Sequence, residues 1–403
     1  MDFSLSGSHF YSLRHLDHFF AMNNKLSKKE KHLAKLVSEY AKLNLKEYKK
    51  VRNITQKYKT KKVETIDVNS KSVSELLSAM AKTGFQGRKL GEVVDVWEEM
   101  IKDKNITIIM GYTGSLSTTG QWKIINWLIE NRYIDVLVST GANISEEIVE
   151  GMGYHYWQGS QNADDAKLLD SDINRYYDIF GDDVEYLDMI NLIAKFIMTC
   201  KEGYNYSTME FLRDFGLWLN KRKVDSIVGV AAKAKVPVFS PALVDSAYGD
   251  AVLIAKSKNF DLILDQAKDY VEFMGLARKV KDIGVIYIGG GVPKDFIQLL
   301  AVSAPLEYYD KKIPDRSGGV FRPATNEWFY PHKYAIQITT DSPQWGGLSG
   351  CTFEEASSWG KEEPGGKNVT CYCDATIALP IVTHALAERI KTKRKGTDFS
   401  DLF

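Results

Sequence analysis

From about residue 70 onward, short apolar runs alternate with longer amphipathic segments. Between the runs, apolar residues recur at helical spacing, which predicts helices over Ser72–Ala81, Gly91–Lys102 and Gln121–Asn131. The apolar runs, each four or five residues long, are Ile106–Met110, Ile134–Val138, Val236–Phe239, Val285–Ile288, Ala335–Ile338 and Thr370–Cys373. Strands that are apolar throughout and separated by helices are typical of a parallel sheet buried on both faces. The pattern therefore predicts an α/β protein with helices on both sides of one parallel sheet.

The first 65 residues have a different pattern, so we divide the chain into a basic helical extension, 1–65, and a catalytic domain, 66–403. Between Lys25 and Lys62 there are fourteen Lys/Arg and three Glu. Apolar residues at helical spacing in this part are Leu33, Leu36, Val37, Tyr40 and Leu43. We expect an amphipathic helix that packs on the body or on a neighbouring subunit, with contact to an acidic partner as the alternative. Residues 306–332 contain prolines and Ser317-Gly318-Gly319, which predict a surface loop.

Composition narrows the class of protein. The 403 residues are 44% hydrophobic and carry 52 basic and 52 acidic side chains, which favours neither nucleic acid nor membrane as a partner. Charged residues interrupt the N-terminal segment and no run of about 18 apolar residues occurs, so we expect a soluble, cytoplasmic protein. The four cysteines, which we expect to be reduced and not to bind metal, are Cys200, Cys351, Cys371 and Cys373.

One predicted strand runs directly into three glycines. In Val285–Leu300, the strand is followed by Gly289-Gly290-Gly291 and then by an amphipathic helix. Glycines let a backbone approach a pyrophosphate closely, and a helix N-terminus supplies N–H donors and partial positive charge. Because the spacing is not G-x-G-x-x-G, a tight structural turn is the alternative.

Two further turns have the same character. Gly111–Gly120 and Ser139–Asn143 each follow a predicted strand with glycines and hydroxyl side chains. Asn143 followed by Glu146 also matches a capping box, so Glu146 could merely satisfy a helix terminus. Three such turns at strand ends favour a dinucleotide over a single phosphate, and with it a Rossmann-like sheet.

Phe353–Pro380 contains the residues most suggestive of covalent chemistry. Lys361 follows Trp359-Gly360 and comes after the acidic pair Glu354-Glu355. A lysine becomes a nucleophile when burial or neighbouring cations favour its neutral form, and a tryptophan can supply an apolar wall. A surface lysine beside a turn is the alternative. Asp374-Ala375 ends a strand, where a carboxylate can hold ribose hydroxyls or cap a helix.

These segments resemble the deoxyhypusine synthase family, in the family's order and over roughly residues 65–392. The resembling stretches are Thr83–Gln86, Gly111–Gly120, Ile134–Val138, Pro237–Leu243, Gly289–Lys294, Ser358–Lys361 and Asp374-Ala375. The resemblance implies a homotetramer with active sites at dimer interfaces, and NAD as cofactor. It also implies a polyamine such as spermidine as donor of an aminobutyl group, which Lys361 carries as an imine to an acceptor amine.

The resemblance, together with two departures from it at Asp295 and Trp345, assigns individual residues. The catalytic candidates are Lys361, Asp295 and Glu146. The cofactor-binding candidates are Ser115, Thr118, Thr140, Gly141, Asp245, Gly290, Thr340, Asp374 and Ala375. The substrate-binding candidates are Asp250, Trp345, Ser349, Glu355 and Trp359.

The sequence departs from the family at the amine site. Asp295 stands where the family has a histidine that takes a proton from the polyamine, and Trp345 and Leu348 stand where it has carboxylates, whereas Ser349 is kept. A cation in a closed pocket needs partners to offset its desolvation, and a tryptophan can hold an ammonium by about 1 kcal/mol. We therefore expect aminobutyl transfer, with a small diamine such as putrescine, giving homospermidine, preferred to a protein lysine as acceptor. The alternatives are an NAD-dependent amine dehydrogenase without transfer and a non-catalytic NAD-binding protein.

Overall fold

The computed structural model describes residues 61–69, 71–308, 320–322 and 327–403, and short stretches between 27 and 46. The chain divides into two compact units, Met1–Val63 and Glu64–Phe403. In the first unit the described residues between 28 and 46 are helical, and the apolar side chains Leu36, Tyr40 and Leu43 are exposed there. Leu33 and Val37, which complete the predicted apolar stripe, lie outside the described residues.

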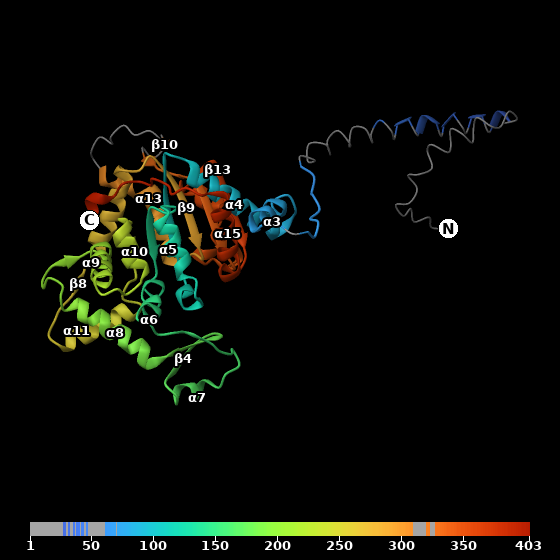
Figure 1. Ribbon diagram of the computed structural model, residues 1–403. Helices are drawn as coiled ribbons and strands as arrows, with labels where there is room; N and C mark the ends of the chain where they lie inside the picture. Colours follow the sequence, from blue (N-terminus) through green and yellow to red (C-terminus); the bar gives the residue numbers. More distant parts are fainter. Residues whose placement is uncertain are drawn as a thin grey trace. The chain divides into compact units, whose positions relative to one another are not determined.

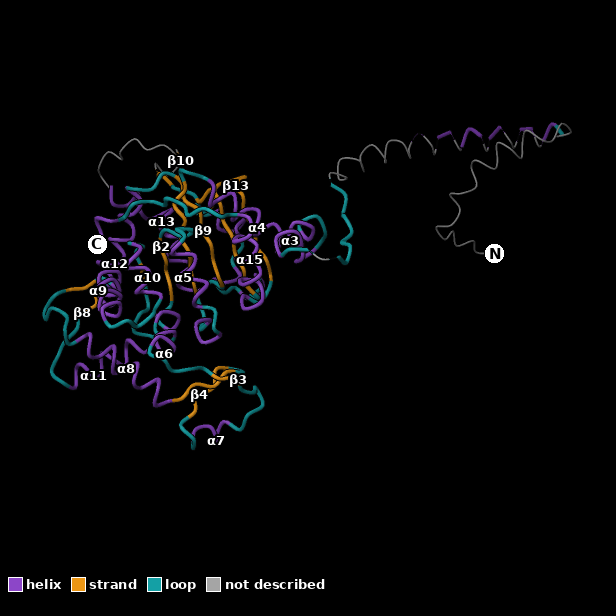
Figure 2. Tube along the Cα trace, viewed as in Figure 1, coloured by secondary structure: helices purple, strands orange, loops and turns teal. Residues whose placement is uncertain are grey.

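The second unit is built on a six-stranded sheet with the order β13-β12-β9-β1-β2-β7. All neighbouring strands in it are parallel. The strands are β1 (Ile106–Tyr112), β2 (Val136–Ser139), β7 (Val238–Phe239), β9 (Asp282–Ile288), β12 (His332–Thr339) and β13 (Glu362–Tyr372). Each contains or overlaps one of the predicted apolar runs, which confirms the parallel α/β fold (Figures 1 and 2).

Helices cover the sheet on both faces, and the alternation of side chains along the strands shows it. Ile108 and Met110 of β1 belong to one buried cluster, whereas Ile109 belongs to the other. The first cluster includes side chains of α4 (Phe85–Lys102), α5 (Trp122–Glu130) and α15 (Ala375–Arg389), and the second includes side chains of α12 (Gln266–Gly275) and α13 (Gly291–Ser303). Because successive strand residues point to opposite faces, a strand buried on both sides must be apolar at every position.

The helices agree with the predictions where the periodicity was clear. Ser72 caps its helix in a capping box with Glu75, and the predicted Gly91–Lys102 helix begins earlier, at Phe85. The helices around the sheet are α3 (Val73–Met80), α4 (Phe85–Lys102), α5 (Trp122–Glu130), α6 (Glu147–Gly151), α8 (Asp183–Ile197), α9 (Thr208–Lys221), α10 (Ile227–Ala234), α11 (Ala247–Ser257), α12 (Gln266–Gly275), α13 (Gly291–Ser303), α14 (Phe353–Ser358) and α15 (Ala375–Arg389).

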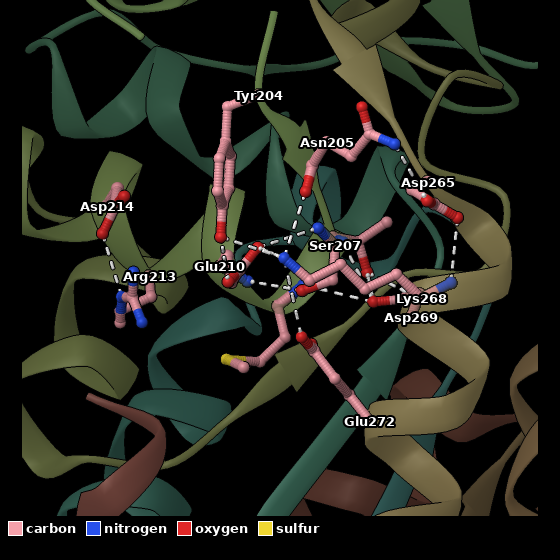
Figure 3. A network of polar contacts seen from close by, with 12 residues as sticks. Tyr204, Asn205, Ser207, Glu210, Arg213, Asp214, Asp265, Lys268, Asp269 and Glu272 are labelled. Carbon is pink, nitrogen blue, oxygen red and sulfur yellow. Dashed lines mark hydrogen bonds and ion pairs between the residues drawn. The ribbon is translucent and has the colours of Figure 1, made fainter. Parts of the chain in front are cut away.

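A polar network joins α9 and α12 (Figure 3), and a further hydrogen bond links it to Ser240 at the end of β7. The buried carboxylate of Asp269 accepts hydrogen bonds from the backbone N–H groups of Thr208 (2.9 Å) and Met209 (3.3 Å) and from the Thr208 hydroxyl. That hydroxyl oxygen in turn accepts from the Ser240 N–H at 2.9 Å. The network therefore fixes the turn after β7, which contains the predicted cofactor residue Asp245.

Two parts of the fold were not predicted. Residues 157–182 form a small antiparallel sheet, which projects from the body with its helix (Figure 1); its elements are β3 (Trp157–Gln158), β4 (Ile173–Tyr176), β5 (Ile179–Asp182) and α7 (Asp165–Leu169). The predicted 306–332 loop contains an antiparallel hairpin, β10 (Val320–Arg322) with β11 (Glu327–Phe329), so that prediction was wrong for these residues. Ser317-Gly318-Gly319 lie outside the described residues. A short parallel pair, β6 (Asn205–Tyr206) with β8 (Ile263–Leu264), completes the described strands.

Two chain-wide expectations concern cysteine and membranes. All four cysteines are free thiols, as predicted. No helix in the described part of the chain combines the length and apolarity needed to cross a lipid bilayer.

Candidate active site

The three-glycine turn between β9 and α13 is packed too closely for side chains. Gly289 and Gly291 have left-handed φ angles of 77° and 60°, which favour glycine. A Cβ on Gly290 would lie 2.4 Å from the Cα of Ser349. The Gly290 N–H donates to Thr113 Oγ1 at 3.0 Å, and the Gly291 N–H donates to Ser349 Oγ at 3.1 Å. The turn is thus held between the end of β1 and the segment after β12.

A cavity of about 400 Å³ opens beside this turn at the carboxyl ends of the strands. Among the predicted cofactor residues, four line it, and so does the predicted substrate residue Ser349; the four are Gly290, Thr340, Asp374 and Ala375. A larger cavity, about 600 Å³, lies at the amino ends of β1 and β9, lined by several lysines and by none of the glycine turns. Because ligands of parallel sheets bind outside the carboxyl ends of the strands, the smaller of these two cavities is the candidate ligand site.

The residues of this cavity fit a dinucleotide. α13 begins at Gly291, and its N-cap residue Gly290 has no side chain to cap it, although Ser349 Oγ accepts from the Gly291 N–H, so the positive end of the helix dipole faces the turn. Asp374 lines the cavity and also accepts from the Thr376 N–H at 2.7 Å as the cap of α15. The helix-cap interpretation of Asp374 is therefore correct, and the same residue also lines the cavity.

A second group of predicted residues surrounds a buried glutamate. Ser115 Oγ donates to Glu146 Oε2 at 2.5 Å, and burial raises the pKa of Glu146 to about 7 despite this bond. The capping-box interpretation of Glu146 is wrong, because the Asn143 side chain accepts from the Leu116 N–H at 2.8 Å instead of capping α6. A carboxyl group with a strongly raised pKa at the edge of a ligand site is a candidate for proton transfer.

The remaining cofactor candidates support neighbouring turns. Thr140 Oγ1 donates to the carbonyl of Gly114, which lines the cavity, and Thr118 Oγ1 donates to the Ser115 carbonyl. A Cβ on Gly141 would lie 2.3 Å from Ser246 Oγ, so Gly141 packs against the turn that contains Asp245. By contrast, Asp250 is exposed on α11 and makes no hydrogen bond or ion pair with the described candidates.

Lys361 is held against α13. Its Nζ donates to Asp295 Oδ1 at 3.2 Å and to Gln298 Oε1 at 3.4 Å, and it lies 5.7 Å from the centre of the Trp359 ring. Its side chain is only 12% exposed, so the surface-lysine alternative is wrong. Asp295 lies four residues beyond Gly291, about 6 Å of helix rise. The amine is therefore about one helical turn from the glycine turn.

Lys294, next to Asp295, connects the two regions and was not among the sequence candidates. It is fully buried; its Nζ donates to Gln337 Oε1 at 3.0 Å and to the Cys351 carbonyl at 2.6 Å. Burial lowers the pKa of Lys294. The Gln337 amide nitrogen donates to the carbonyls of Gly289 and Ser349. A continuous set of hydrogen bonds thus runs from the glycine turn to the buried cation beside Lys361.

The predicted aromatic residues of the amine site are solvent-accessible. Trp345 is 78% exposed and Trp359 is 65% exposed, and Glu355 is exposed on α14. In the described structure, Trp359 is close to Lys361, whereas Trp345 makes no ring or cation contact with the described site residues.

The fold and site define an α/β protein with a nucleotide-type glycine turn and a sheltered, hydrogen-bonded lysine one helical turn away. The family profile named deoxyhypusine synthase matches residues 75–386, and the chain belongs to this family. Membership implies an enzyme, a transferase, and supports an aminobutyl transfer function.

Individual relatives agree with this assignment. The chain is 46% identical to "Probable deoxyhypusine synthase 2" of Archaeoglobus fulgidus, over 76% of this chain and 95% of the relative. It is also 46% identical to "Probable deoxyhypusine synthase 2" of Methanosarcina acetivorans, over 80% and 89% of the two chains. A crystal structure of a "putative deoxyhypusine synthase" from Entamoeba histolytica superposes with a TM-score of 0.54 at 17% identity, over 82% of this chain and 98% of that one. This last likeness concerns the fold alone.

Proposed function

We propose that the protein is an NAD-dependent 4-aminobutyl transferase that carries the aminobutyl group on Lys361. The observation that carries the proposal is the position of Lys361, sheltered from solvent and hydrogen-bonded to Asp295 one helical turn from the glycine turn. A covalent carrier must reach the carbon that the cofactor oxidises and must be shielded from water, which would hydrolyse an imine. The low exposure of Lys361 and its contact with the helix that begins at the glycine turn support the proposal.

NAD, when bound, supplies hydride transfer, taking a hydride from the carbon beside the donor nitrogen and returning it at the end. The residues that would hold it are those of the cavity wall: the Gly290 turn and α13 N-terminus for the pyrophosphate, and Asp374 for ribose hydroxyls. Ser115, Thr140 and Glu146 border the same edge of the sheet and support this assignment.

Three residues near Lys361 have proposed roles in proton transfer, amine binding and activation of the lysine. Asp295 is 40% exposed and accepts a hydrogen bond from Lys361, so it is placed to receive a proton from an incoming amine or from the lysine. Trp359 offers a ring face to a cationic amine near Nζ. Lys294 adds a buried positive charge nearby, and a neighbouring cation favours the neutral, nucleophilic form of a lysine.

We infer that the acceptor is a small diamine such as putrescine, giving homospermidine, in preference to a protein lysine. The support is the absence of the two carboxylates at Trp345 and Leu348, together with the exposed aromatic side chains of Trp345 and Trp359. We further propose a homotetramer with active sites at dimer interfaces, and a basic extension, residues 1–65, separate from the catalytic domain.

The test is mass spectrometry of the full-length protein incubated with NAD+ and spermidine and trapped with borohydride. We expect one aminobutyl unit on the Lys361 peptide, and none in Lys361→Arg. The dehydrogenase alternative would be established if wild type shows no adduct and the Lys361→Arg variant still reduces NAD+ in the presence of amine. Protein that binds NAD+ without reducing it would establish the non-catalytic alternative.

The same assay tests the identity of the aminobutyl acceptor and the role of Asp295 as the base. Added putrescine should discharge the adduct and yield homospermidine, and discharge only by a protein lysine would refute the small-amine inference. Asp295→Ala should slow NADH formation from NAD+ and amine, and an unchanged rate would show that Asp295 is not the base.

A further inference from the structure

A group of fully buried polar side chains lies behind Lys361. Gln298, which accepts from Lys361 Nζ, is completely buried, as are His332 and Glu362. His332 Nδ1 and Glu362 Oε1 are 3.1 Å apart. The Gln298 amide favours the charged form of the Glu362 carboxylate, but its Nε2 has no hydrogen-bond partner in the described structure. Gln298 is therefore bonded to the lysine amine and interacts with the Glu362–His332 pair without a hydrogen bond.

Burial of this polar group destabilises the folded state. In the described structure, three of its buried atoms have no hydrogen-bond partner in the protein: Gln298 Nε2, His332 Nε2 and Glu362 Oε2. Each such atom loses the hydrogen bond that it would make with water in the unfolded chain, and packed apolar side chains would avoid this loss. Packing alone therefore does not account for these residues, whereas a role at the adjacent lysine does.

The two carboxylates around Lys361 differ in their exposure to solvent. Asp295 is 40% exposed and faces the site, whereas Glu362 has no exposed surface. Burial raises the pKa of Glu362, while His332, Lys294 and the Gln298 amide favour its charged form. The other titratable groups that face these charged side chains are Tyr287, Cys351 and Glu355. A proton acceptor must be reached by the substrate, but a counter-charge need not be.

We propose that Glu362, paired with His332, is the buried counter-charge for the cationic forms of Lys361. The part of this inference that concerns the covalent imine rests on the proposed function; the part that concerns the free ammonium does not. Glu362 acts through the local field and not by contact with the reacting atoms, so it is a positioning residue.

The transfer step shows why a counter-charge is needed. The neutral Lys361 amine adds to the carbon of the protonated donor imine, the bond from that carbon to the donor nitrogen breaks, and the leaving amine departs neutral with one proton. The new imine on the lysine nitrogen keeps one proton and the positive charge. No electron leaves the reacting atoms in this step, and the net charge is unchanged. The charge has moved onto Lys361, where a fixed carboxylate stabilises it.

The first test measures Lys361 without substrate or cofactor. The full chain is labelled with acetic anhydride over a range of pH, and the Lys361 peptide is quantified by mass spectrometry. In Glu362→Gln, which keeps the shape and removes the charge, the midpoint of the labelling curve should fall by about one pH unit. The matched control is Glu363→Gln, the exposed neighbour, which should keep the wild-type midpoint because solvent screens its charge.

A conservative variant separates charge from packing. Glu362→Asp keeps the carboxylate but leaves a gap, so a charge role predicts a midpoint close to wild type, whereas a packing role predicts a larger disturbance than in Glu362→Gln. Thermal unfolding of each variant shows whether it folds. If Glu362→Gln does not fold, Gln298→Met is the fallback variant. It removes the amide that contacts Lys361, and it should also lower the midpoint of the Lys361 labelling curve. Equal midpoints in wild type and in the folded variants would overturn the inference.

The trapped adduct provides the second readout. With NAD+ and spermidine, Glu362→Gln should accumulate several-fold less borohydride-trapped Lys361 adduct than wild type or Glu363→Gln. Equal adduct would overturn the role in the imine. If wild type forms no adduct, the proposed function fails, while the labelling shift still decides the role of Glu362 toward the ammonium.

Discussion

Replacing Gly290 by alanine tests whether the glycine turn is a cofactor cradle. The added Cβ would lie 2.4 Å from Ser349 Cα and 2.7 Å from Ser349 Cβ and Oγ, where ordinary contacts begin at about 3.4 Å. Ser349 must therefore retreat by about 1 Å, which disturbs its bond to the Gly291 N–H. Gly290 itself has a φ of −172°, outside the left-handed region that favours glycine, so the prediction rests on the contact with Ser349.

The magnitude follows from the overpacking. Inserting a methyl group into a packed site costs about 1–3 kcal/mol, and the cavity wall is the side that can yield. If about 1.4 kcal/mol of this cost falls on the bound state, NAD+ affinity drops about tenfold. We expect a Kd for NAD+ at least tenfold higher than wild type, measured by isothermal titration calorimetry or cofactor fluorescence.

The control is Gly84→Ala, whose Cβ would meet nothing within 4 Å and whose φ is −132°. It should bind NAD+ like wild type. If Gly290→Ala also binds with the wild-type Kd while remaining folded, the cavity beside the turn is not the cofactor site.

Two further predictions concern stability. Burial raises the pKa of Glu146 to about 7 from an unfolded value near 4.5, so its contribution to stability is complete below about pH 4.5 and is lost as pH rises through 7. The Tm of Glu146→Gln relative to wild type should therefore rise between pH 5 and pH 8.5, by the equivalent of at most about 3 kcal/mol; a difference independent of pH would contradict the assignment. Asp269→Ala removes the acceptor of the buried Thr208 and Met209 N–H groups and should cost at least about 2 kcal/mol in urea unfolding. Asp265→Ala, which removes the half-buried cap of α12, should cost only about 1 kcal/mol, and equal losses would show that the α9–α12 network is not held by Asp269.

The sheet was predictable because burial on both faces leaves a signal in the sequence. Strands such as β1 and β9 are apolar at successive positions, and glycines follow β9 directly. The first half of β13 has no such signal, since Glu362–Lys367 is polar and contains Pro364 and two glycines. Only its last residues, from Thr370, were recognised, because the earlier ones pair irregularly with β12.

The site was predictable only where a residue belongs to a recognisable turn. Gly290, Ser349 and Asp374 follow strands and meet at one cavity, as parallel strands require. Gln298 and Glu362 were missed because their roles depend on contacts between segments over sixty residues apart. Gln298 lies three residues after Asp295, on the same side of its helix, and this spacing was the one local signal.

Capping signals were ambiguous for the same reason. Asn143 and Glu146 match a capping box in spacing, but Asn143 bonds the Gly111–Gly120 turn and Glu146 bonds Ser115. A local pattern cannot show which of two nearby donors a side chain will choose, because the choice depends on tertiary packing.

One helix, α13, begins at the glycine turn and carries Asp295 and Gln298, which hold Lys361. If a pyrophosphate binds at the glycine turn, as proposed, a displacement of the first turn of α13 would also move the two side chains that hold the lysine amine, because they lie within two turns on the same helix. The proposed cofactor and amine sites would then be coupled: if NAD+ tightens the binding of amine by some factor, amine tightens the binding of NAD+ by the same factor.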